Sequence, residues 1–347
     1  MRKLKLIFFA LLGAGIGSLL AVYFVIFSGV FPEIRDMWVT TAMTTLNHKW
    51  LATAFLPDKT INEIMERNTV NDDNYKTDTN LVKFETTTTP DFTEPNSKET
   101  ETTTEPVDPY IEEGYELLED GLYKKEVKGD TWYGYLMLVT DPSRVSLTDT
   151  VRQHSVGQTV MQMVQQNNAI AGINGGGFQD GVNYDSNGGN PAGLLIIDGE
   201  VVNPLEDYGQ KYSVIGFNED NVFVMGKMTM QEALDNKIKY CVDFRPFLIV
   251  NGEKVIKEGT GGWGIAPRTA LGQRSTGEVL FFCVDGRQVH SIGVDLVVLQ
   301  DTLYEEGCVN AGMMDGGSST VMIYNGEFVN KPSLGYERYI NNCWIIK

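Results

Sequence analysis

Residues 278–287 read EVLFFCVDGR, a run of strand-forming residues that ends in Asp-Gly beside an arginine. Six further runs have a similar strand-forming composition: TWYGYLMLV (131–139), GLLIIDGEVV (193–202), YSVIGF (212–217), NVFVMG (221–226), RPFLIVNGE (245–253) and TVMIYNGEFV (320–329). β-Branched and aromatic residues favour strands, and Asp-Gly or Asn-Gly after a strand favours a hairpin turn. Such pairs begin at Asp198, Asn251, Asp285 and Asn325. The sequence therefore predicts a largely antiparallel sheet as the frame of the fold.

Helical periodicity appears between these strand runs, over 159–168, 229–237 and 294–306. In the last segment Leu296, Leu299 and Leu303 recur at the spacing of one helix face. Strands and helices do not alternate regularly, so a doubly wound fold is not expected. The prediction is an α+β domain with an antiparallel or mixed sheet core and flanking helices.

The N-terminus begins MRKLK and then runs from Leu6 to Pro32 without a charged residue. This exceeds the roughly 20 apolar residues that cross a bilayer, and a secretory signal usually has an apolar region of only about 7 to 15 residues. We therefore expect a cytoplasmic tail (1–5) and a membrane-spanning helix (6–32) that contacts the lipid bilayer. Because Arg2, Lys3 and Lys5 precede the span, the remaining chain is expected outside the cell.

Three further segments follow this predicted anchor. Residues 33–84 show no chemical motif and are interpreted as a juxtamembrane stalk or packing helix. Residues 85–109 are rich in Thr, Glu and Pro and predict an extended linker, since such a composition buries too little to offset folding entropy. Residues 110–347 form the predicted main domain.

The charge distribution and the numbers of cysteine and histidine residues argue against several classes of protein. Residues 85–120 carry twelve acidic residues against Lys98 alone, which accounts for most of the net charge of −18. The chain has no basic stripe, so a nucleic-acid partner is not expected. The four cysteines, all within the predicted main domain, could pair outside the cell, although Cys283 suits a buried free thiol equally well. A serine hydrolase or a histidine zinc site is disfavoured because the main domain contains only His154 and His290.

Polar residues beside glycines gather between 263 and 322, in WGIAPRTALG, VDGRQ and NAGMMDGGSSTVM. In the first run Arg268 offers a planar guanidinium suited to an anion, with a structural salt bridge as the alternative. Asp315 precedes two glycines that let a ligand approach the backbone, with a plain tight turn as the alternative. Asp285 is either a site carboxylate or one more Asp-Gly turn. Asn174, before three glycines, suits sugar hydroxyls or backbone capping.

This grouping of motifs resembles the phosphodiester glycosidase family. The resemblance rests on AGINGGGF (171–178), RPFLIVNGE (245–253), APRTALG (266–272), VDGR (284–287), GVDL (293–296) and DGGSST (315–320), in family order over roughly 125–347. It implies hydrolysis of a sugar 1-phosphodiester at the bond between the anomeric carbon and the phosphate oxygen. Such a reaction passes through an oxocarbenium-like state, which a nearby carboxylate stabilises.

The resemblance implies roles for particular residues. Asp315 and Asp285 would be the catalytic carboxylates, and Arg268 would assist departure of the phosphate, with no assignment of nucleophile, acid or base. The expected substrate-binding residues are Asn174, Gly175, Phe178, Thr269, Arg287, Gly316, Gly317, Ser318, Ser319 and Thr320.

A metal-like pattern appears in the loop QDGVNYDSNGGN, where Asn183, Asp185 and Asn187 alternate before a glycine. It is similar to the first half of a calcium loop, but Leu194 stands where a bidentate acid is expected. A divalent cation such as calcium is thus a candidate cofactor, and an ordinary polar loop is the alternative.

Two functions remain open at this level. One is an extracellular hydrolase of sugar 1-phosphodiesters in cell-envelope glycans or exopolysaccharides. The other is a non-catalytic carbohydrate-binding or envelope-assembly protein on the same fold, because motifs alone do not establish turnover. The enzyme interpretation requires that Asp315 and Arg268 converge on one pocket.

Overall fold

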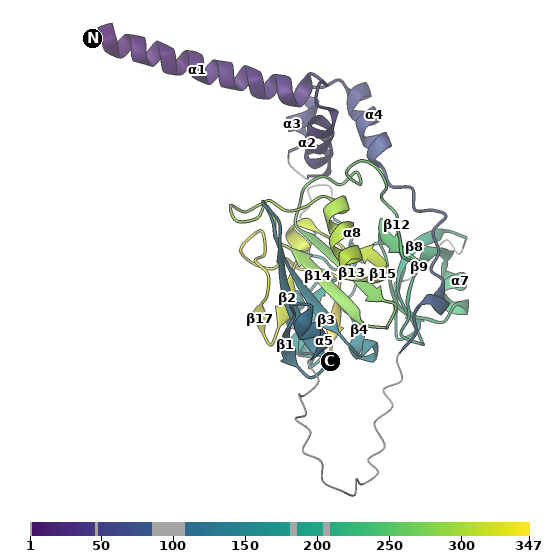
Figure 1. Ribbon diagram of the computed structural model, residues 1–347. Helices are drawn as coiled ribbons and strands as arrows, with labels where there is room; N and C mark the ends of the chain where they lie inside the picture. Colours follow the sequence, from purple (N-terminus) through teal and green to yellow (C-terminus); the bar gives the residue numbers. More distant parts are fainter. Residues whose placement is uncertain (1, 46–47, 85–107, 181–185, 204–208) are drawn as a thin grey trace, which may run out of the picture.

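A computed structural model describes residues 2–45, 48–84, 108–180, 186–203 and 209–347. Its strands form three antiparallel sheets with helices around them, so the α+β class predicted from the sequence is confirmed for the described residues (Figure 1). The segment 85–107, which holds most of the predicted linker, lies outside these residues.

The large sheet has eight strands in the described chain. Their spatial order is β1 (Glu116–Glu119), β2 (Leu122–Lys128), β3 (Tyr133–Val139), β14 (Val279–Val284), β13 (Arg268–Arg274), β15 (Cys308–Met313), β11 (Phe247–Val250) and β12 (Glu253–Lys254).

Two smaller sheets of five strands each accompany the large one in the described residues. The β8 sheet has the order β7 (Glu200–Val201), β6 (Leu195–Ile197), β10 (Ile238–Asp243), β8 (Lys211–Asn218) and β9 (Phe223–Thr229). The β5 sheet has the order β17 (Glu327–Phe328), β16 (Met322–Tyr324), β5 (Ala171–Asn174), β18 (Asn342–Ile346) and β4 (Val145–Asp149).

The described helices are α1 (Arg2–Phe27), α2 (Pro32–Thr44), α3 (Trp50–Thr53), α4 (Asp58–Asn68), α5 (Pro109–Glu112), α6 (Val160–Gln166), α7 (Met230–Asp235) and α8 (Leu296–Glu305). Short 3-10 turns cover Thr79–Leu81, Pro142–Arg144 and Gly317–Ser319. The helices predicted over 159–168, 229–237 and 294–306 are confirmed as α6, α7 and α8. Thr159 and Thr229 each complete a capping box, which satisfies free backbone N–H groups at the first turn.

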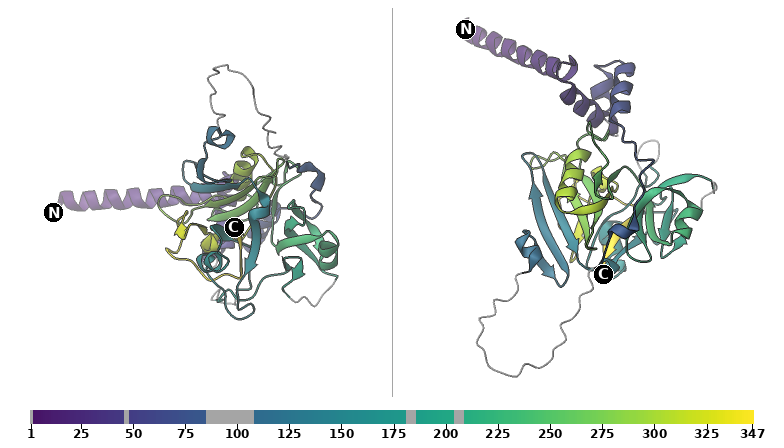
Figure 2. Two further views of the ribbon diagram at one scale, coloured as in Figure 1. Left: turned by 90° about the horizontal axis from the view of Figure 1, so that it is seen from below. Right: turned by 45° about the vertical axis from the view of Figure 1, so that its right-hand side comes forward.

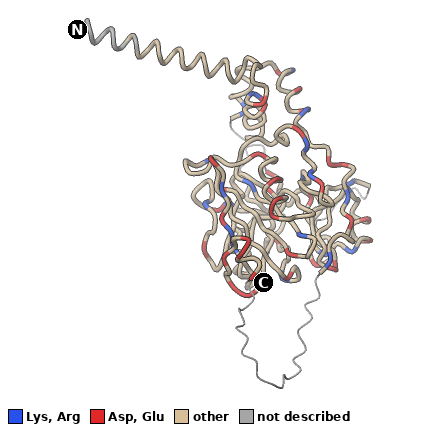
Figure 3. The backbone as a smooth tube through the Cα atoms, in the orientation of Figure 1, with Lys and Arg blue, Asp and Glu red and all other residues tan. Residues whose placement is uncertain are grey.

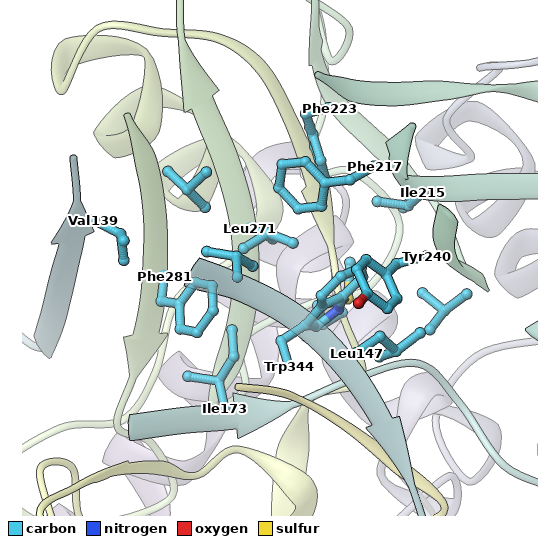
Figure 4. Close-up of a cluster of buried hydrophobic side chains, with 14 of the residues drawn as sticks. Val139, Leu147, Ile173, Ile215, Phe217, Phe223, Tyr240, Leu271, Phe281 and Trp344 are labelled. Atoms are coloured by element: carbon cyan, nitrogen blue, oxygen red, sulfur yellow. The ribbon is translucent and has the colours of Figure 1, made fainter. Parts of the chain in front are cut away.

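The strands at the centre of the large sheet are buried on both faces, which explains their continuous hydrophobic runs. Phe281 of β14 faces a core cluster that includes Ile173 and Trp344 of the β5 sheet (Figure 4). Its neighbour Phe282 faces the opposite cluster, where Leu299 of α8 packs. Successive strand residues point to opposite faces, and full burial of each phenylalanine contributes about 1.5–3 kcal/mol. A rigid sheet therefore carries the strand ends that form the site.

The predicted hairpins at Asp198, Asn251 and Asn325 are confirmed as the β6–β7, β11–β12 and β16–β17 turns. Each of these residues has a positive φ (51°, 55° and 49°) and precedes a glycine with positive φ, as two-residue hairpin turns require. The hairpin signal at Asp285 is wrong. β14 pairs with β13 and β3, and the chain after it enters a loop held by long-range hydrogen bonds to the Asp285 carboxylate.

The N-terminal helix α1 points away from the domain, whereas α2, α3 and α4 stand on one end of it (Figures 1 and 2). α1 ends at Phe27 and does not continue to Pro32. Within the described residues, no single helix has the length and apolar character of a membrane span. The segments Leu11–Phe27 and Pro32–Thr44 meet that test only when taken together, with an 89° bend between them.

The described parts of residues 33–84, a segment interpreted from the sequence as a stalk or packing helix, pack on the domain. Helices α2 and α4 share a small core that includes Val39, Ala42 and Ile64. Thr41 Oγ1 of α2 accepts a hydrogen bond from the Ile265 backbone N–H at 2.9 Å. Thr77 pairs with Met225 of β9 through both backbone and side chain. These contacts hold the segment against the main domain at two places, the chain before β13 and strand β9.

Of the two alternatives that the sequence left open for the cysteines, the structure has the free thiol. Cys241, Cys283, Cys308 and Cys343 are all free and buried. They lie on β10, β14, β15 and β18 as parts of the hydrophobic clusters, and burial raises the pKa of each thiol. They therefore act as small core residues.

Acidic and basic residues are interspersed along the described backbone, without a basic stripe (Figure 3).

Candidate functional site

The strand order brings the predicted motifs to one edge of the large sheet. β13 lies between β14 and β15, with Arg268 opposite Val284 and Ala270 opposite Met313. Because these neighbours are antiparallel, the start of β13 meets the ends of β14 and β15. The segments that follow β14 and β15 therefore converge on Arg268, although they are far apart in sequence.

A polar cavity of about 350 Å³ lies at this edge. The charged side chains that line it are Asp180, Arg268, Arg287, Asp315 and Arg338. Glycines 316 and 317 and Ser318 form part of its wall. Asp315 and Arg268 thus converge on one cavity, as the enzyme interpretation required.

Asp315 follows β15 and is half-buried in the cavity wall. Its backbone N–H donates to the Gly175 carbonyl at 3.0 Å, and its Oδ1 accepts from the Gly316 N–H at 2.9 Å. Burial raises the pKa of Asp315, and the Ser319 hydroxyl and the Arg338 guanidinium oppose that rise. A carboxylate with a raised pKa inside a cavity is suited to acid–base or nucleophilic work.

Arg268 is held rigidly by backbone carbonyls. Its Nη2 donates to the carbonyls of Trp263 (2.7 Å) and Gly264 (2.6 Å), and its Nε donates to Val294 (3.3 Å). Burial, with Arg287 beside it, lowers the pKa of Arg268 to about 10, so the group stays charged at neutral pH. No carboxylate partner saturates this guanidinium in the described residues, which leaves its charge available to an anion in the cavity.

Arg287 approaches the cavity beside two glycines. A Cβ on Gly317 would lie 3.2 Å from Arg287 Nη2, and one on Gly316 would lie 3.6 Å from Arg268 Nη1. Gly317 also has φ of +64°, which disfavours other residues. Burial lowers the pKa of Arg287, and Asp315 opposes this. The missing side chain at 317 therefore leaves room for the Arg287 guanidinium, whereas the contact between a Cβ on Gly316 and Arg268 would be an ordinary van der Waals contact.

Sequence reasoning missed Arg338 and Asp180. Arg338 Nη2 pairs with Asp180 Oδ1 at 2.9 Å, and the guanidinium stacks over the Phe178 ring at 4.6 Å. Asp180 lies two residues after the predicted Phe178, so its position gave some signal. Arg338 lies in a loop before β18 that carries none of the quoted motifs, and only tertiary contacts place it in the cavity.

Aromatic side chains form another part of the cavity wall. Phe178, Phe244 and Trp263 all line it, and the rings of Phe244 and Trp263 lie 6.4 Å apart. Aromatic faces pack well on the apolar faces of sugar rings, and such rings bury large areas. The cavity therefore combines cationic groups with aromatic surface.

Asp285, expected as a catalytic carboxylate, does not line the cavity and is 1% exposed. Its Oδ1 accepts from the Lys331 N–H (2.8 Å) and Asn330 Nδ2 (3.2 Å), and its Oδ2 pairs with His290 Nε2 (2.9 Å). Because protein groups occupy both oxygens, Asp285 organises the loop that presents Arg287. A catalytic role for it is not supported by this geometry.

Asn174 and Thr269, expected to bind substrate, are buried beneath the cavity. Asn174 Nδ2 donates to the Asp315 carbonyl at 2.6 Å, and its Oδ1 accepts from Thr269 Oγ1 (2.7 Å) and the Val321 N–H (3.1 Å). Gly175 supports the same strand end through its carbonyl. These residues therefore position Asp315 and do not line the cavity.

Of the remaining predicted residues, some line the cavity and others lie behind its wall. Phe178, Gly316, Gly317 and Ser318 line the cavity. Ser319 and Thr320 are 2% and 1% exposed, do not line it, and belong to the turn behind Asp315.

The calcium candidates fall mostly outside the described residues. Asn183 and Asp185 lie there, and Asn187 donates to the Ser155 carbonyl at 2.6 Å and accepts from the Gly189 N–H at 3.1 Å. Over the described ranges no cluster of three or more His, Cys, Asp or Glu side chains is arranged to hold a metal ion.

The fold and the cavity define an antiparallel α+β protein with an arginine-rich, aromatic-walled cavity at one edge of its large sheet. Residues 167–347 match the family model described as phosphodiester glycosidase, and the chain belongs to that family. This confirms the resemblance inferred from the motifs.

Two relatives and one solved structure illustrate the relationship. The chain is 25% identical over 190 residues to the SPbeta prophage-derived uncharacterized protein YomE of Bacillus subtilis, and the match covers 53% of the chain and 28% of that protein. It is 27% identical over 233 residues to N-acetylglucosamine-1-phosphodiester alpha-N-acetylglucosaminidase of Mus musculus, covering 61% of the chain and 43% of that protein. The chain thus spans less than half the length of either relative.

The zebrafish N-acetylglucosamine-1-phosphodiester alpha-N-acetylglucosaminidase catalytic domain, described as auto-inhibited by its pro-peptide, has a similar fold. The match has a TM-score of 0.54 and 24% identity, and it covers 65% of this chain and 81% of that one.

Proposed function

We propose that this chain hydrolyses the glycosidic bond of sugar 1-phosphodiesters. The observation that carries the proposal is the charge of the polar cavity. Three arginines and two aspartates line it, which gives one excess positive charge when all are ionised. A phosphodiester carries one negative charge, so its burial there leaves no uncompensated charge. Membership of the phosphodiester glycosidase family supports the same substrate class.

Arg268, Arg287 and Arg338 would bind the phosphate, and Asp315 would lie toward the anomeric carbon. When the bond between that carbon and the phosphate oxygen breaks, its electron pair leaves with the phosphate, and water supplies the new hydroxyl group. The arginines stabilise the charge that develops on the phosphate, so the leaving group needs no strong acid. Asp315 stabilises the positive charge on the sugar, as nucleophile or as base for the water.

Asp180 is the second carboxylate in the cavity, but it is paired with Arg338. Its role in this mechanism is to hold that arginine beside the phosphate. Phe178 and Trp263 provide surfaces for the sugar ring.

We further propose that the site acts outside the cell on envelope or exopolysaccharide sugar phosphates, with α1 as a lipid-contacting anchor. Basic residues Arg2, Lys3 and Lys5 lie in the first turns of α1, and the apolar part of the helix that follows has exposed large hydrophobic side chains, Leu19 and Leu20 among them. This arrangement supports an N-terminus on the cytoplasmic side.

The test is to incubate the purified full chain with the methyl phosphodiesters of N-acetylglucosamine 1-phosphate and glucose 1-phosphate in heavy-oxygen water. Glycosidic cleavage releases free sugar and unlabelled methyl phosphate. Label in the methyl phosphate, or release of sugar 1-phosphate, would mean cleavage at phosphorus and would overturn the assignment.

The same experiment addresses the binding-protein alternative. If Asp315→Asn abolishes sugar release, turnover belongs to this cavity. Saturable binding of these esters by a folded chain, without release of any sugar, would favour a carbohydrate-binding function.

A further inference from the structure

A second cavity adjoins the polar one and is larger, at about 1210 Å³. The two cavities share Thr45, Ile265, Arg287, Ser318 and Arg338 in their walls. Arg287 and Arg338 are two of the groups proposed to hold the phosphate. A ligand whose phosphate lies between them therefore has one side in the polar cavity and the other side in this second cavity.

The second cavity, here named the apolar groove, has walls from two parts of the chain. Helix α2 supplies Ile34, Met37 and Trp38, and loops of the main domain supply Ile292 and Leu334 opposite them. A sugar chain extending from the phosphate would leave its hydroxyl groups facing these hydrocarbon walls with few hydrogen-bond partners. The walls match a hydrocarbon ligand better than a carbohydrate ligand.

Several of these apolar walls remain exposed. Ile34, Ile292 and Leu334 are 47%, 47% and 48% exposed. Exposed apolar side chains gathered around one cavity are typical of ligand-binding grooves and of membrane or protein contact sites.

The apolar groove also lies beside the end of α1. Phe27 of α1 stacks on Phe55 with ring centroids 4.9 Å apart, and it meets the Trp38 ring edge-on at 6.1 Å. Trp38 itself lines the groove. With α1 as the proposed lipid anchor, the groove mouth would lie near the bilayer surface, where a lipid chain enters without crossing water.

We propose that the second ester group of the substrate is a long hydrocarbon chain that lies in the apolar groove. The substrate is then a sugar linked through one phosphate to a lipid alcohol. Hydrolysis consumes water and yields free sugar and the lipid phosphate, with cleavage at the anomeric carbon. This inference rests on the proposed glycosidase function and names its substrate class.

The test uses sugar 1-phosphodiesters that differ only in the second ester: methyl, butyl and octyl. The purified full chain is assayed in one nanodisc preparation beside Leu334→Asp and the control Leu117→Asp. Leu117 is 51% exposed on β1 and does not line the groove. Since substrate partitioning into lipid is the same for every variant, the ratio of wild-type to variant kcat/KM at each chain length isolates the groove.

The expected result is a wild-type kcat/KM that rises by up to about fourfold for each buried methylene. Leu334→Asp should lower kcat/KM for the octyl ester by at least about tenfold and leave the methyl ester within about twofold. Leu117→Asp should change neither. Equal wild-type to Leu334→Asp ratios for methyl and octyl esters would overturn the lipid assignment while leaving the glycosidase function intact. If Leu334→Asp instead raises kcat/KM equally for every ester, the groove walls restrict access to the site without binding the hydrocarbon chain, and the lipid assignment is overturned.

Binding measurements with phosphate monoesters, which contain no glycosidic bond, test the lipid assignment independently of the glycosidase function. Octyl phosphate, below its micelle concentration, should bind the wild-type chain at least about tenfold more tightly than methyl phosphate by calorimetry, with this preference lost in Leu334→Asp. If this holds while no ester is hydrolysed, the groove is a lipid-phosphate site and the glycosidase function fails. Equal affinity for both phosphates would overturn the lipid assignment.

Discussion

The side-chain amide of Asn174 donates a hydrogen bond to the backbone carbonyl of Asp315, with 2.6 Å between Nδ2 and O. Asn174 ends β5 in one sheet, and Asp315 follows β15 in another. The amide oxygen of Asn174 also accepts from Thr269 and Val321, so one buried side chain fixes the segment that carries Asp315. The cavity is therefore positioned by a joint between two sheets.

Loss of the hydrogen bonds made by the Asn174 side chain should lower both the stability of the chain and its activity. Asn174→Ala leaves buried donors and an acceptor without partners, and we expect the free energy of unfolding to fall by about 1–3 kcal/mol. Activity should fall because Asp315 is no longer held. Denaturant unfolding and sugar-release assays measure the two effects.

Asn236→Ala is the matched control for this change. Asn236 makes a similar amide-to-carbonyl bond at 2.6 Å to Glu232, but in an exposed position. We expect a small stability change and normal activity there. An equal loss of unfolding free energy and of sugar release in both variants would mean that the Asn174 hydrogen bonds between the two sheets do not position Asp315.

The two aspartates proposed from the sequence should behave in opposite ways. Asp315→Asn should lower kcat by about 10²–10⁴, a typical contribution of a catalytic acid–base group. Because burial raises the pKa of Asp315, its ionised form destabilises the fold at neutral pH. The thermal midpoint of Asp315→Asn should therefore equal or exceed that of the wild type.

Asp285→Asn should instead destabilise the chain. The carboxylate accepts from Lys331 and Asn330 and pairs with His290, and an amide group cannot replace both oxygens as acceptors. We expect a loss of about 1–3 kcal/mol in unfolding free energy and a raised KM through misplacement of Arg287. Full stability with a loss of kcat alone would restore Asp285 as a catalytic residue.

Gly317→Ala should weaken substrate binding beyond its effect on folding. The added Cβ would lie 3.2 Å from Arg287 Nη2, and the positive φ of +64° adds a backbone cost of about 1–2 kcal/mol. Gly326→Ala is the control, since its φ is +77° but its Cβ would meet nothing within 4 Å. Both variants should lose similar stability, and only Gly317→Ala should lose kcat/KM. Identical kinetics in the two variants would show that the space beside Arg287 does not matter.

The pH dependence of activity should report the charge of Arg338. Burial raises the pKa of Asp315, and Arg338 opposes this by favouring the ionised carboxylate. If the ionised form is the active one, activity declines as pH falls through this pKa. Arg338→Gln removes the favourable charge, so the acidic limb of kcat/KM should move to higher pH. The exposed Arg152→Gln serves as control and should leave the profile in place.

Local sequence predicted those features whose determinants are close together in the chain. The turns at Asn251 and Asn325 and the helices capped by Thr159 and Thr229 all formed, because turn conformation and capping depend on a few adjacent residues. The glycines after Asp315 also marked a close approach of other groups. Composition identified the sheet core, and ordered motifs identified the family.

Features that depend on distant partners were beyond the sequence. Asp-Gly forms a hairpin turn at Asp198 but not at Asp285. The Asp285 carboxylate instead accepts hydrogen bonds from Asn330 and Lys331, which are distant in the sequence. The sequence also left open whether the cysteines pair, and the structure places the four free thiols on separate strands within apolar clusters.

The sequence by itself thus determined the α+β class, the hairpin turns at Asp198, Asn251 and Asn325, the helices α6, α7 and α8, and the family motifs that contain Arg268 and Asp315. Tertiary structure alone decided that Arg338 joins them, that Asn174 supports Asp315 from beneath the cavity, and that α2 forms one wall of the apolar groove. The physical reason is the sequence distance over which each effect acts. Backbone preferences depend on a few neighbouring residues, whereas a cavity forms where strand order and sheet packing bring together side chains that are far apart in the sequence.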